Sequence, residues 1–294
     1  MPSAEFEAFV QQLKTNPMPS ELKAMREAYE GMGQMFPLPA GAAVRPVTLG
    51  GRPAEWYDPP SGQTQAAILY LHGGGYAIGS LNTHRHLGVE IARRTGLSTV
   101  ALDYRLGPEN LFPAAVDDAV AAYRELRAAR PGAKIGFAGD SAGAGLVMAA
   151  MVAARDAGLR VPDCAYCMSP WVDLGVTGES AVSKAAVDPL ASGDLLHVMA
   201  RRYLGDGDPN QPLASPIRAD LKGLPPLLIQ VGSAEVLLDD SIRLAQAAGK
   251  ADVTVALEIW PHMIHVWPFF FPAFPEGHEA LGRACAFLRE HLAS

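Results

Sequence analysis

The stretch with the clearest chemical potential is GDSAG, residues 139–143. It ends an apolar run and passes directly into a helix of small and apolar residues, within "KIGFAGDSAGAGLVMAAMVAAR" at 134–155. A tight strand-to-helix turn holds its serine in a strained backbone conformation, which is tolerated only when the neighbouring residues lack bulk. The small residues around Ser141 meet that demand, and the following helix directs free N–H groups at any developing anion. Ser141 is therefore predicted to be a nucleophile.

A second unusual stretch is "YLHGGGYAIGS", residues 70–80, where three glycines follow an apolar run. Acyl transfer through a serine produces a tetrahedral oxyanion, which needs preorganised N–H donors close by. Backbone N–H groups approach most closely where no Cβ intervenes, as at Gly73, Gly74 and Gly75. The N–H of Ala142 would complete such an oxyanion hole from the serine side.

A serine hydroxyl also needs a base, normally a histidine that a carboxylate orients. Of the eight histidines, two remain as candidates. They are His262 and His265, in "WPHMIHVW" just after the last predicted strand, and their spacing alone does not choose between them. The other histidines have simpler interpretations: His84 and His86 face apart on a predicted helix, His197, His278 and His291 lie in polar helical surroundings, and His72 braces the glycine loop.

The chain alternates apolar runs with amphipathic segments of helical length, such as 113–130. This pattern predicts an α/β fold with a mostly parallel sheet and helices on both faces. Gly50 and Gly51 mark the turn of an antiparallel hairpin at one sheet edge. The strands are predicted at residues 66–72, 97–103, 134–139, 164–169, 226–232 and 253–260.

Two stretches break this rhythm and predict a lid over the core. Residues 1–40 hold two amphipathic helical patterns, whose apolar stripes need something to cover. Residues 174–222 are rich in Pro, Gly and Asp and are too long for a plain connection between strands. We therefore expect a cap made of 1–40 and 174–222, and a core made of 41–173 and 223–294.

Composition excludes several classes of protein. Hydrophobic residues make up 49% and charged residues 19% of the 294 residues, as in an ordinary globular protein. A net charge of −7 without a basic run argues against a nucleic-acid partner. No run reaches the roughly 18 apolar residues of a membrane span, and no signal peptide precedes the fold, so a cytoplasmic location is expected. Cys164 and Cys167 face opposite sides of a strand, which favours buried thiols over a metal or redox pair.

Five motifs stand in order along the chain. They are HGGGY (72–76), "DYRLGPENLFPAAVDDAVAAY" (103–123), GDSAG (139–143), "SPWVDL" (169–174) and "MIHVW" (263–267). Together they resemble the bacterial hormone-sensitive lipase family of esterases. The resemblance covers nearly the whole chain from residue 40 onward and implies an α/β-hydrolase sheet of eight strands with a mainly helical cap. It also implies Ser141 as nucleophile, His265 as base, and Gly74, Gly75 and Ala142 as oxyanion donors, with His262 a bystander.

The triad acid is where the sequence departs from the family pattern, in which an aspartate begins a D-P-L tripeptide after the strand that precedes the histidine. Here that stretch is "VGSAEVLLDDS", 231–241. Aligning the two in register puts Glu235 at the acid position, with Asp239 as the alternative. A glutamate can hold the imidazole tautomer equally well. Asp188 does begin a D-P-L, but it lies in the predicted cap before the strand, so we interpret it as a turn residue.

Several further polar residues are interpreted as structural. Asp140, beside the nucleophile, is expected to make a scaffold hydrogen bond. A loop-bracing network is expected from Asp103, Arg105, Glu109 and Pro113, which resemble the corresponding residues of the family.

The expected activity is that of a serine carboxylesterase whose substrates are small esters with short acyl chains. This reaction needs neither a metal nor an organic cofactor. Tyr76, next to the glycines, is expected to contact the substrate. The aromatic segment 266–277 is expected to line the pocket, anchor the cap or form a subunit contact, and dimers are frequent in the family. Two alternatives stay open: a hormone-receptor-like binding protein on the same fold, and an amide or formamide hydrolase with the same triad.

Overall fold

The computed structural model describes residues 1–293, whose strands form one eight-stranded sheet. The order across the sheet is β1-β2-β4-β3-β5-β6-β7-β8, with β1, β2 and β4 paired antiparallel and all other neighbours parallel. The strands are β1 (Ala43–Leu49), β2 (Arg52–Asp58), β3 (Ala67–Leu71), β4 (Ser98–Leu102), β5 (Ile135–Asp140), β6 (Cys164–Met168), β7 (Leu227–Gly232) and β8 (Val255–Trp260).

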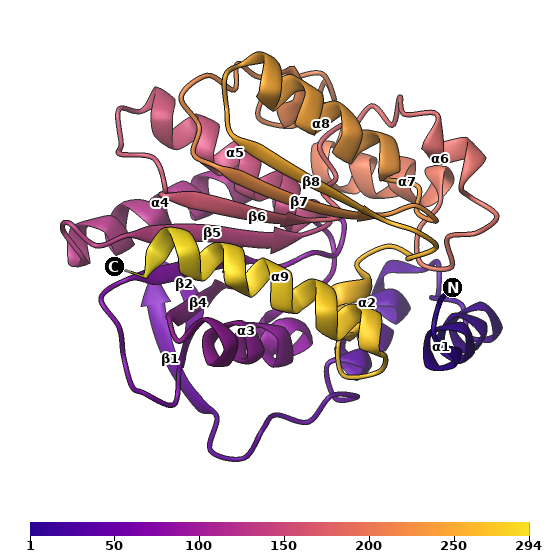
Figure 1. The fold of residues 1–294 in the computed structure, drawn as a ribbon. Coiled ribbons are helices and arrows are strands. Elements are labelled where there is room, and N and C mark those ends of the chain that lie inside the picture. Colours follow the sequence, from indigo (N-terminus) through magenta and orange to yellow (C-terminus); the bar gives the residue numbers. More distant parts are fainter. Residues whose placement is uncertain (294) are drawn as a thin grey trace.

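Helices cover both faces of this sheet (Figure 1). One face carries α3 and α9, and the other carries α4, α5 and α8. The helices α1, α2, α6 and α7 gather beyond one end of the strands. The helical elements are α1 (Ala4–Thr15), α2 (Leu22–Met32), α3 (Leu81–Thr95), α4 (Ala114–Ala129), α5 (Ala142–Asp156), α6 (Ser180–Ser183), α7 (Gly193–Leu204), α8 (Leu238–Lys250) and α9 (Pro275–Leu292), with short 3₁₀ turns at η1 (Pro216–Arg218) and η2 (Trp267–Phe270).

The central strands are buried on both faces, because their side chains alternate between two apolar layers. In β6, Ala165 and Cys167 pack on the layer of α4, α5 and α8, whereas Cys164, Tyr166 and Met168 pack on the layer of α3 and α9. The two cysteines therefore face opposite sides, as predicted. Both thiols are buried and free, and burial raises the pKa of each to about 12, so they stay protonated and inert.

The predicted α/β architecture is confirmed. Each predicted strand is present with ends that agree to within two residues, and the hairpin turns at Gly50 and Gly51 on the edge of the sheet. Strand ends are the least determined feature of an apolar pattern, because loop residues just beyond a strand are also buried.

Residues 1–40 and 174–222 are expected to form one cap, but the two helices of the first stretch pack against different partners. Helix α2 meets α7, where the Arg202 guanidinium lies 3.8 Å from the Met25 sulfur. Helix α1 packs instead on the aromatic segment after β8. The ring centroid of Phe6 lies 5.1 Å from that of Phe274, and the ring of Phe9 lies 4.8 Å from that of Phe270. The aromatic segment thus anchors the first helix, one of the roles expected for it.

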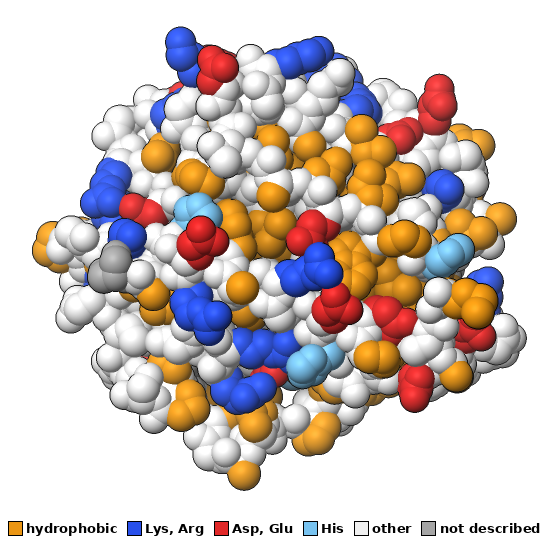
Figure 2. Space-filling model, in the orientation of Figure 1, with side chains coloured by type: hydrophobic (Ala, Val, Ile, Leu, Met, Phe, Trp, Pro, Cys, Tyr) orange, Lys and Arg blue, Asp and Glu red, His pale blue; other side chains and the backbone are white. Residues whose placement is uncertain are grey.

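The charged side chains on one face of the surface are mixed in sign, as the absence of a basic run in the sequence suggests (Figure 2). On the face shown in Figure 2, acidic and basic side chains are intermingled between apolar patches. Within residues 1–293, no helix combines the length and apolarity that crossing a bilayer demands.

Truncation of Phe9 tests the anchoring of α1. Phe9→Ala removes a buried ring that touches both Phe270 and Phe274, so we expect a loss of about 3 kcal/mol in the free energy of unfolding, measured by urea titration. Val182→Ala, at a side chain that is 84% exposed, should change this free energy by less than about 0.5 kcal/mol. Equal effects of the two variants would show that α1 is not held by this contact.

Candidate active site

Ser141 occupies a strained turn between β5 and α5. Its φ is +52°, a region that non-glycine residues rarely adopt. The turn is held on both sides, because the Ser141 N–H donates to the Met168 carbonyl at 2.8 Å and its carbonyl accepts from the Trp171 N–H at 3.0 Å. A side chain at Gly143 would overlap the carbonyl oxygens of Leu71 and His72, so only glycine lets α5 start this close to β3.

A continuous chain of hydrogen bonds joins Ser141, His265 and Glu235. The Ser141 Oγ lies 2.9 Å from His265 Nε2, and His265 Nδ1 lies 2.8 Å from Glu235 Oε2. An ionised carboxylate can only accept, so Nδ1 carries the proton and Nε2 is free to accept from the serine. Of the two histidines that the sequence left open, His265 is the one within reach of the serine. His262 is exposed at the start of the loop, and its N–H donates to Ser233.

Glu235 is fully buried and accepts three hydrogen bonds. Its Oε1 accepts from the Gly232 N–H at 2.5 Å and from the Ser169 hydroxyl at 2.9 Å, while Oε2 faces His265. The Ser169 oxygen also accepts from the Val266 N–H at 3.1 Å, which ties the acid to the histidine loop. The sequence analysis assigned Ser169 no role. Its position at the head of SPWVDL, directly after a predicted strand, was the available signal.

The electrostatics of the site favour a basic imidazole. Burial works against the charged form of His265, but the hydrogen bond and the negative charge of Glu235 outweigh it. Asp188 and Asp140 add smaller contributions of the same sign, and together these groups raise the pKa of His265 above its ordinary value.

The glycine loop is tied to the serine turn through Asp140. One carboxylate oxygen of Asp140 accepts from the Gly73 N–H at 3.0 Å and from the Tyr70 hydroxyl at 2.6 Å, and the other faces His84 Nε2 at 3.3 Å. Although burial opposes ionisation, the charge and hydrogen bond of His84, followed by the bond from Tyr70, lower the pKa of Asp140. Asp140 therefore makes the expected scaffold bond, and His84, for which no contact was predicted, belongs to the same network.

The loop itself is shaped for close approach. Gly74 has a φ of +116°, and a Cβ there would run into the Ile78 carbonyl. Gly74 and Gly75 line the same cavity as Ser141, whose following residue, Ala142, opens α5. The first N–H groups of a helix have no acceptor within the helix, so the Ala142 N–H is free to bind an anion.

Tyr76 packs against the cap helix α7. Its ring stacks on Tyr203, with centroids 3.9 Å apart and planes 5° apart, and its side chain is buried. This contact braces the glycine loop against α7. The residues that line the cavity at Ser141 do not include Tyr76, and its contact with the substrate stays a prediction.

Asp239, the alternative acid, is engaged elsewhere. It accepts from the Ser180 N–H at 2.8 Å, and its neighbour Asp240 accepts from the N–H groups of Val172 and Asp173. Asp188 forms the predicted turn by accepting from the Leu190 N–H at 3.0 Å. It also reaches the Val236 N–H, a contact that the turn interpretation did not foresee.

Three of the four expected loop-bracing residues, Asp103, Arg105 and Glu109, make polar contacts with residues outside that set. Glu109 binds Arg26 of α2 through two hydrogen bonds of 2.7 and 2.8 Å. Arg105 makes a similar pair with Asp118, and the carbonyl of Asp103 accepts from Arg52. His72 also behaves as expected, since it is buried in the glycine loop and stacks on Tyr104 with ring centroids 4.3 Å apart.

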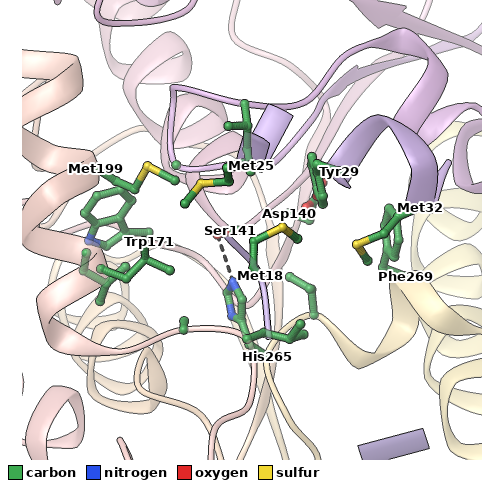
Figure 3. Close-up of a pocket in the computed structure, with 18 of the residues that line it drawn as sticks. Met18, Met25, Tyr29, Met32, Asp140, Ser141, Trp171, Met199, His265 and Phe269 are labelled. Atoms are coloured by element: carbon green, nitrogen blue, oxygen red, sulfur yellow. Dashed lines mark hydrogen bonds between the residues drawn. The ribbon is translucent and has the colours of Figure 1, made fainter. Parts of the chain in front are cut away.

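A cavity of about 110 Å³ opens directly onto the Ser141 hydroxyl and His265. Its wall is almost entirely apolar and rich in methionine. Figure 3 shows the methionines of α2 and α7 around the serine–histidine pair, with Trp171 and Phe269 at the sides. The four methionines of the wall are Met18, Met25, Met32 and Met199. Such a space suits a small uncharged acyl group next to a nucleophile.

No metal centre is evident in this part of the chain, because residues 1–293 hold no cluster of three or more His, Cys, Asp or Glu side chains arranged to bind an ion.

Comparison with known proteins gives a consistent result. Residues 68–269 match a family model described as the alpha/beta hydrolase fold. An acetyl-hydrolase of Streptomyces hygroscopicus is 49% identical over 273 residues, which span 92% of this chain and 90% of that protein. An esterase of Acinetobacter venetianus is 36% identical over 276 residues, again 92% of this chain and 90% of the relative.

Solved structures agree along the whole chain. The crystal structure of an esterase from the bacterial hormone-sensitive lipase family is 43% identical, with a TM-score of 0.96 over 100% of both chains. Esterase EstE5 soaked with p-nitrophenyl butyrate is 45% identical, with a TM-score of 0.94 over 99% of this chain and 100% of that one. On the match of the family model and of these relatives, this chain belongs to the alpha/beta hydrolases and, among them, to the esterases of the bacterial hormone-sensitive lipase family.

Proposed function

We propose that this chain is a serine carboxylesterase that hydrolyses short-chain acyl esters through an acyl-enzyme. The observation that carries the proposal is the pair of hydrogen bonds that joins Ser141 through His265 to Glu235. An apolar cavity opens onto Ser141 and His265. The names of the relatives, acetyl-hydrolase and esterase, support the same reaction.

In the first step, His265 Nε2 takes the proton of the Ser141 hydroxyl while Oγ attacks the ester carbonyl carbon. The carbonyl oxygen becomes an oxyanion, for which the N–H groups of Gly74, Gly75 and Ala142 are the proposed donors. Each such donor contributes about 3 kcal/mol to transition-state stabilisation. The carbon–oxygen bond to the alcohol then breaks, and the alcohol leaves with the proton from His265.

In the second step, water repeats the attack on the acyl-enzyme. His265 takes a proton from the water, the carboxylic acid leaves, and Ser141 regains its proton. Throughout both steps Glu235 stays ionised, keeps the proton of His265 on Nδ1 and stabilises the imidazolium that forms.

The domain division is part of the proposal. Residues 1–40 and 174–222 form a cap that supplies about half of the residues of the cavity wall, and residues 41–173 and 223–294 form the catalytic core. A homodimer and a cytoplasmic location stay predictions from the sequence.

Two other functions deserve comparison. A receptor on this fold would need no intact serine–histidine pair, whereas the 2.9 Å contact between Ser141 and His265 favours catalysis. An amide hydrolase would use the same residues on a different leaving group. Rates on p-nitrophenyl butyrate and on butyranilide separate the two hydrolases, and a faster anilide reaction would contradict the esterase proposal.

Replacement of the nucleophile is the direct test of the proposal. We expect Ser141→Ala to lower kcat/KM on p-nitrophenyl butyrate by about 10³-fold or more, because no other group can form the acyl-enzyme. The exposed Ser61 provides the matched control, since Ser61→Ala should keep wild-type activity. A folded wild-type protein that is no faster than Ser141→Ala would leave the receptor alternative.

The identity of the acid is tested by two amide substitutions. Glu235→Gln presents an N–H to His265 Nδ1 and favours the wrong tautomer, so kcat should fall by about 10⁴-fold. Asp239→Asn should keep most of the activity, because an asparagine oxygen can still accept from the Ser180 N–H. The reverse pattern in steady-state assays would reassign the acid to Asp239.

The cavity predicts a limit on acyl length. Its volume of about 110 Å³ is below the roughly 150 Å³ of an apolar cavity that accommodates benzene. A second apolar cavity of about 220 Å³ lies between α1 and α2, and Met32, together with Met18 and Phe270, lines both cavities. Met32→Ala should therefore raise the ratio of kcat/KM on p-nitrophenyl octanoate to kcat/KM on p-nitrophenyl butyrate. The ratio should rise by up to about fourfold for each additional methylene that the enlarged cavity buries.

Met35 supplies the control for this series, because it lines only the second cavity and is half-exposed. Met35→Ala should leave the ratio of octanoate to butyrate rates unchanged. An unchanged ratio in Met32→Ala as well would mean that the acyl chain lies against another part of the wall.

A further inference from the structure

The cap reaches into the core next to the proposed triad acid. Asp188, in the cap segment between α6 and α7, is buried, and its Oδ2 accepts from the Val236 N–H at 3.0 Å. Val236 directly follows Glu235 on the loop between β7 and α8. The carboxylate thus holds the peptide unit that leads out of the acid.

The carbonyl group of Val236 is also bound by a residue of the cap. The Val236 carbonyl accepts from the Ser180 hydroxyl of α6 at 2.7 Å. Ser180 and Asp239 in turn exchange two hydrogen bonds, of 2.8 and 3.0 Å, between α6 and the start of α8. Both polar groups of Val236 are therefore bound by cap residues, which fixes the loop that carries Glu235.

The second oxygen of Asp188 shapes the cavity. Its Oδ1 accepts from the N–H groups of Leu190 and Ala191 at 3.0 and 3.2 Å, and both residues line the cavity at Ser141. One buried carboxylate consequently joins the cavity wall to the acid loop. A carboxylate with three donors is a stable arrangement in a buried site, since each donor offsets part of its desolvation.

The charge of Asp188 also acts on the site. Burial raises the pKa of Asp188 to about 6, while the charge of His265 lowers it and that of Glu235 raises it. The titratable groups that act on His265 are Glu235, Asp188 and Asp140, from the acid loop, the cap and β5 respectively. A negative charge at Asp188 therefore favours the imidazolium that forms during the reaction.

We propose that Asp188 is a positioning residue for ester hydrolysis, which couples the cap to the triad by clamping the Glu235 loop and the cavity wall together and by stabilising protonated His265. This inference rests on the proposed function, because it assigns to Asp188 an effect on the reaction of Ser141.

Asp188→Asn is the decisive variant. The side chain keeps its shape, but one of its two acceptors becomes a donor that opposes a backbone N–H. Displacement of Glu235 should lower kcat/KM on p-nitrophenyl butyrate by about 10²-fold. The loss of the negative charge should also lower the pKa of His265, so the acidic limb of the kcat/KM profile should move to lower pH by roughly half a pH unit or more.

The matched control is Asp163→Asn. Asp163 also accepts from a backbone N–H, that of Ile135 at 2.8 Å, but it lies at the opposite end of β5 from Ser141. Asp163→Asn should reduce thermal stability without moving the acidic limb. The proposal would be overturned if Asp188→Asn also lost thermal stability without moving the acidic limb and kept kcat/KM within about threefold of wild type, because a misplaced Glu235 would lower kcat/KM far more. Asp188 would then be a merely structural residue.

A double-mutant cycle tests the route of the effect. If Asp188 acts through Glu235, Asp188→Asn should cost much less in the Glu235→Gln background than in the wild type. Equal costs in the two backgrounds would contradict the coupling. Wild-type activity that depends on Ser141 shows in the same experiment that the proposed function holds, so the failure of one idea is distinguishable from the failure of the other.

Ser180→Ala decides the question if Asp188→Asn does not fold. It removes the bonds of the hydroxyl to the Val236 carbonyl and the Asp239 N–H, and it leaves every charge near His265 in place. We expect kcat/KM to fall by about tenfold through the loosened acid loop, with the acidic limb unmoved. Full activity of a folded Ser180→Ala variant would show that the cap does not position Glu235.

Discussion

The strained turn at Ser141 is the constraint on which the rest of the site depends. A non-glycine residue at a φ of +52° costs about 1–3 kcal/mol, and it persists only when its surroundings fix it. Here the backbone bonds to Met168 and Trp171 supply that support, because β5 lies next to β6 in the middle of the sheet. The turn raises Ser141 above the carboxyl ends of the parallel strands, where the loops after β3, β6, β7 and β8 meet. The glycines, Ser169, Glu235 and His265 come to the serine from these loops.

Two buried carboxylates flank the serine, and each is stabilised in the same way. Glu235 accepts from Gly232, Ser169 and His265, and Asp140 accepts from Gly73 and Tyr70 and faces His84. A buried charge without such partners would be too costly to keep.

The two carboxylates nevertheless have different consequences. One oxygen of Glu235 contacts the histidine, so the proposed role of this carboxylate is in proton transfer. Both oxygens of Asp140 contact the glycine loop and its supports, so this carboxylate fixes the shape of that loop.

The sequence predicted those features that are written in consecutive residues. The central strands, the hairpin at Gly50 and the serine turn each follow from a local pattern of apolar, small or turn-forming residues. The structure brings Ser141, His265 and Glu235 into hydrogen-bond contact, while their catalytic roles stay predictions.

Glu235 needed alignment with a family pattern, because nothing in its immediate neighbours distinguishes it from Asp239. The features that escaped prediction depend on contacts between distant segments. Ser169 and Glu235 are 66 residues apart, and Asp188 and Val236 are 48 apart. The stacking of Tyr76 on Tyr203 is a further contact between distant segments that escaped prediction.

Core and cap supply different parts of the cavity. The Ser141 hydroxyl and His265 belong to loops of the sheet, whereas α2, α7 and the segments before them supply about half of the wall, including Met25, Met32, Met199 and Leu190. Methionine is unbranched and polarisable, so such a wall can adjust to acyl groups of different shape at little cost.

The reacting groups, in contrast, must be held to within a fraction of an ångström. Adjustable and rigid parts can share one cavity only if movement of the wall does not reach the triad. The bonds of Ser180 and Asp188 to the peptide groups of Val236 lie at that boundary. They join a buried turn of the cap to the acid loop, and none of the four methionines of the cavity wall takes part in them.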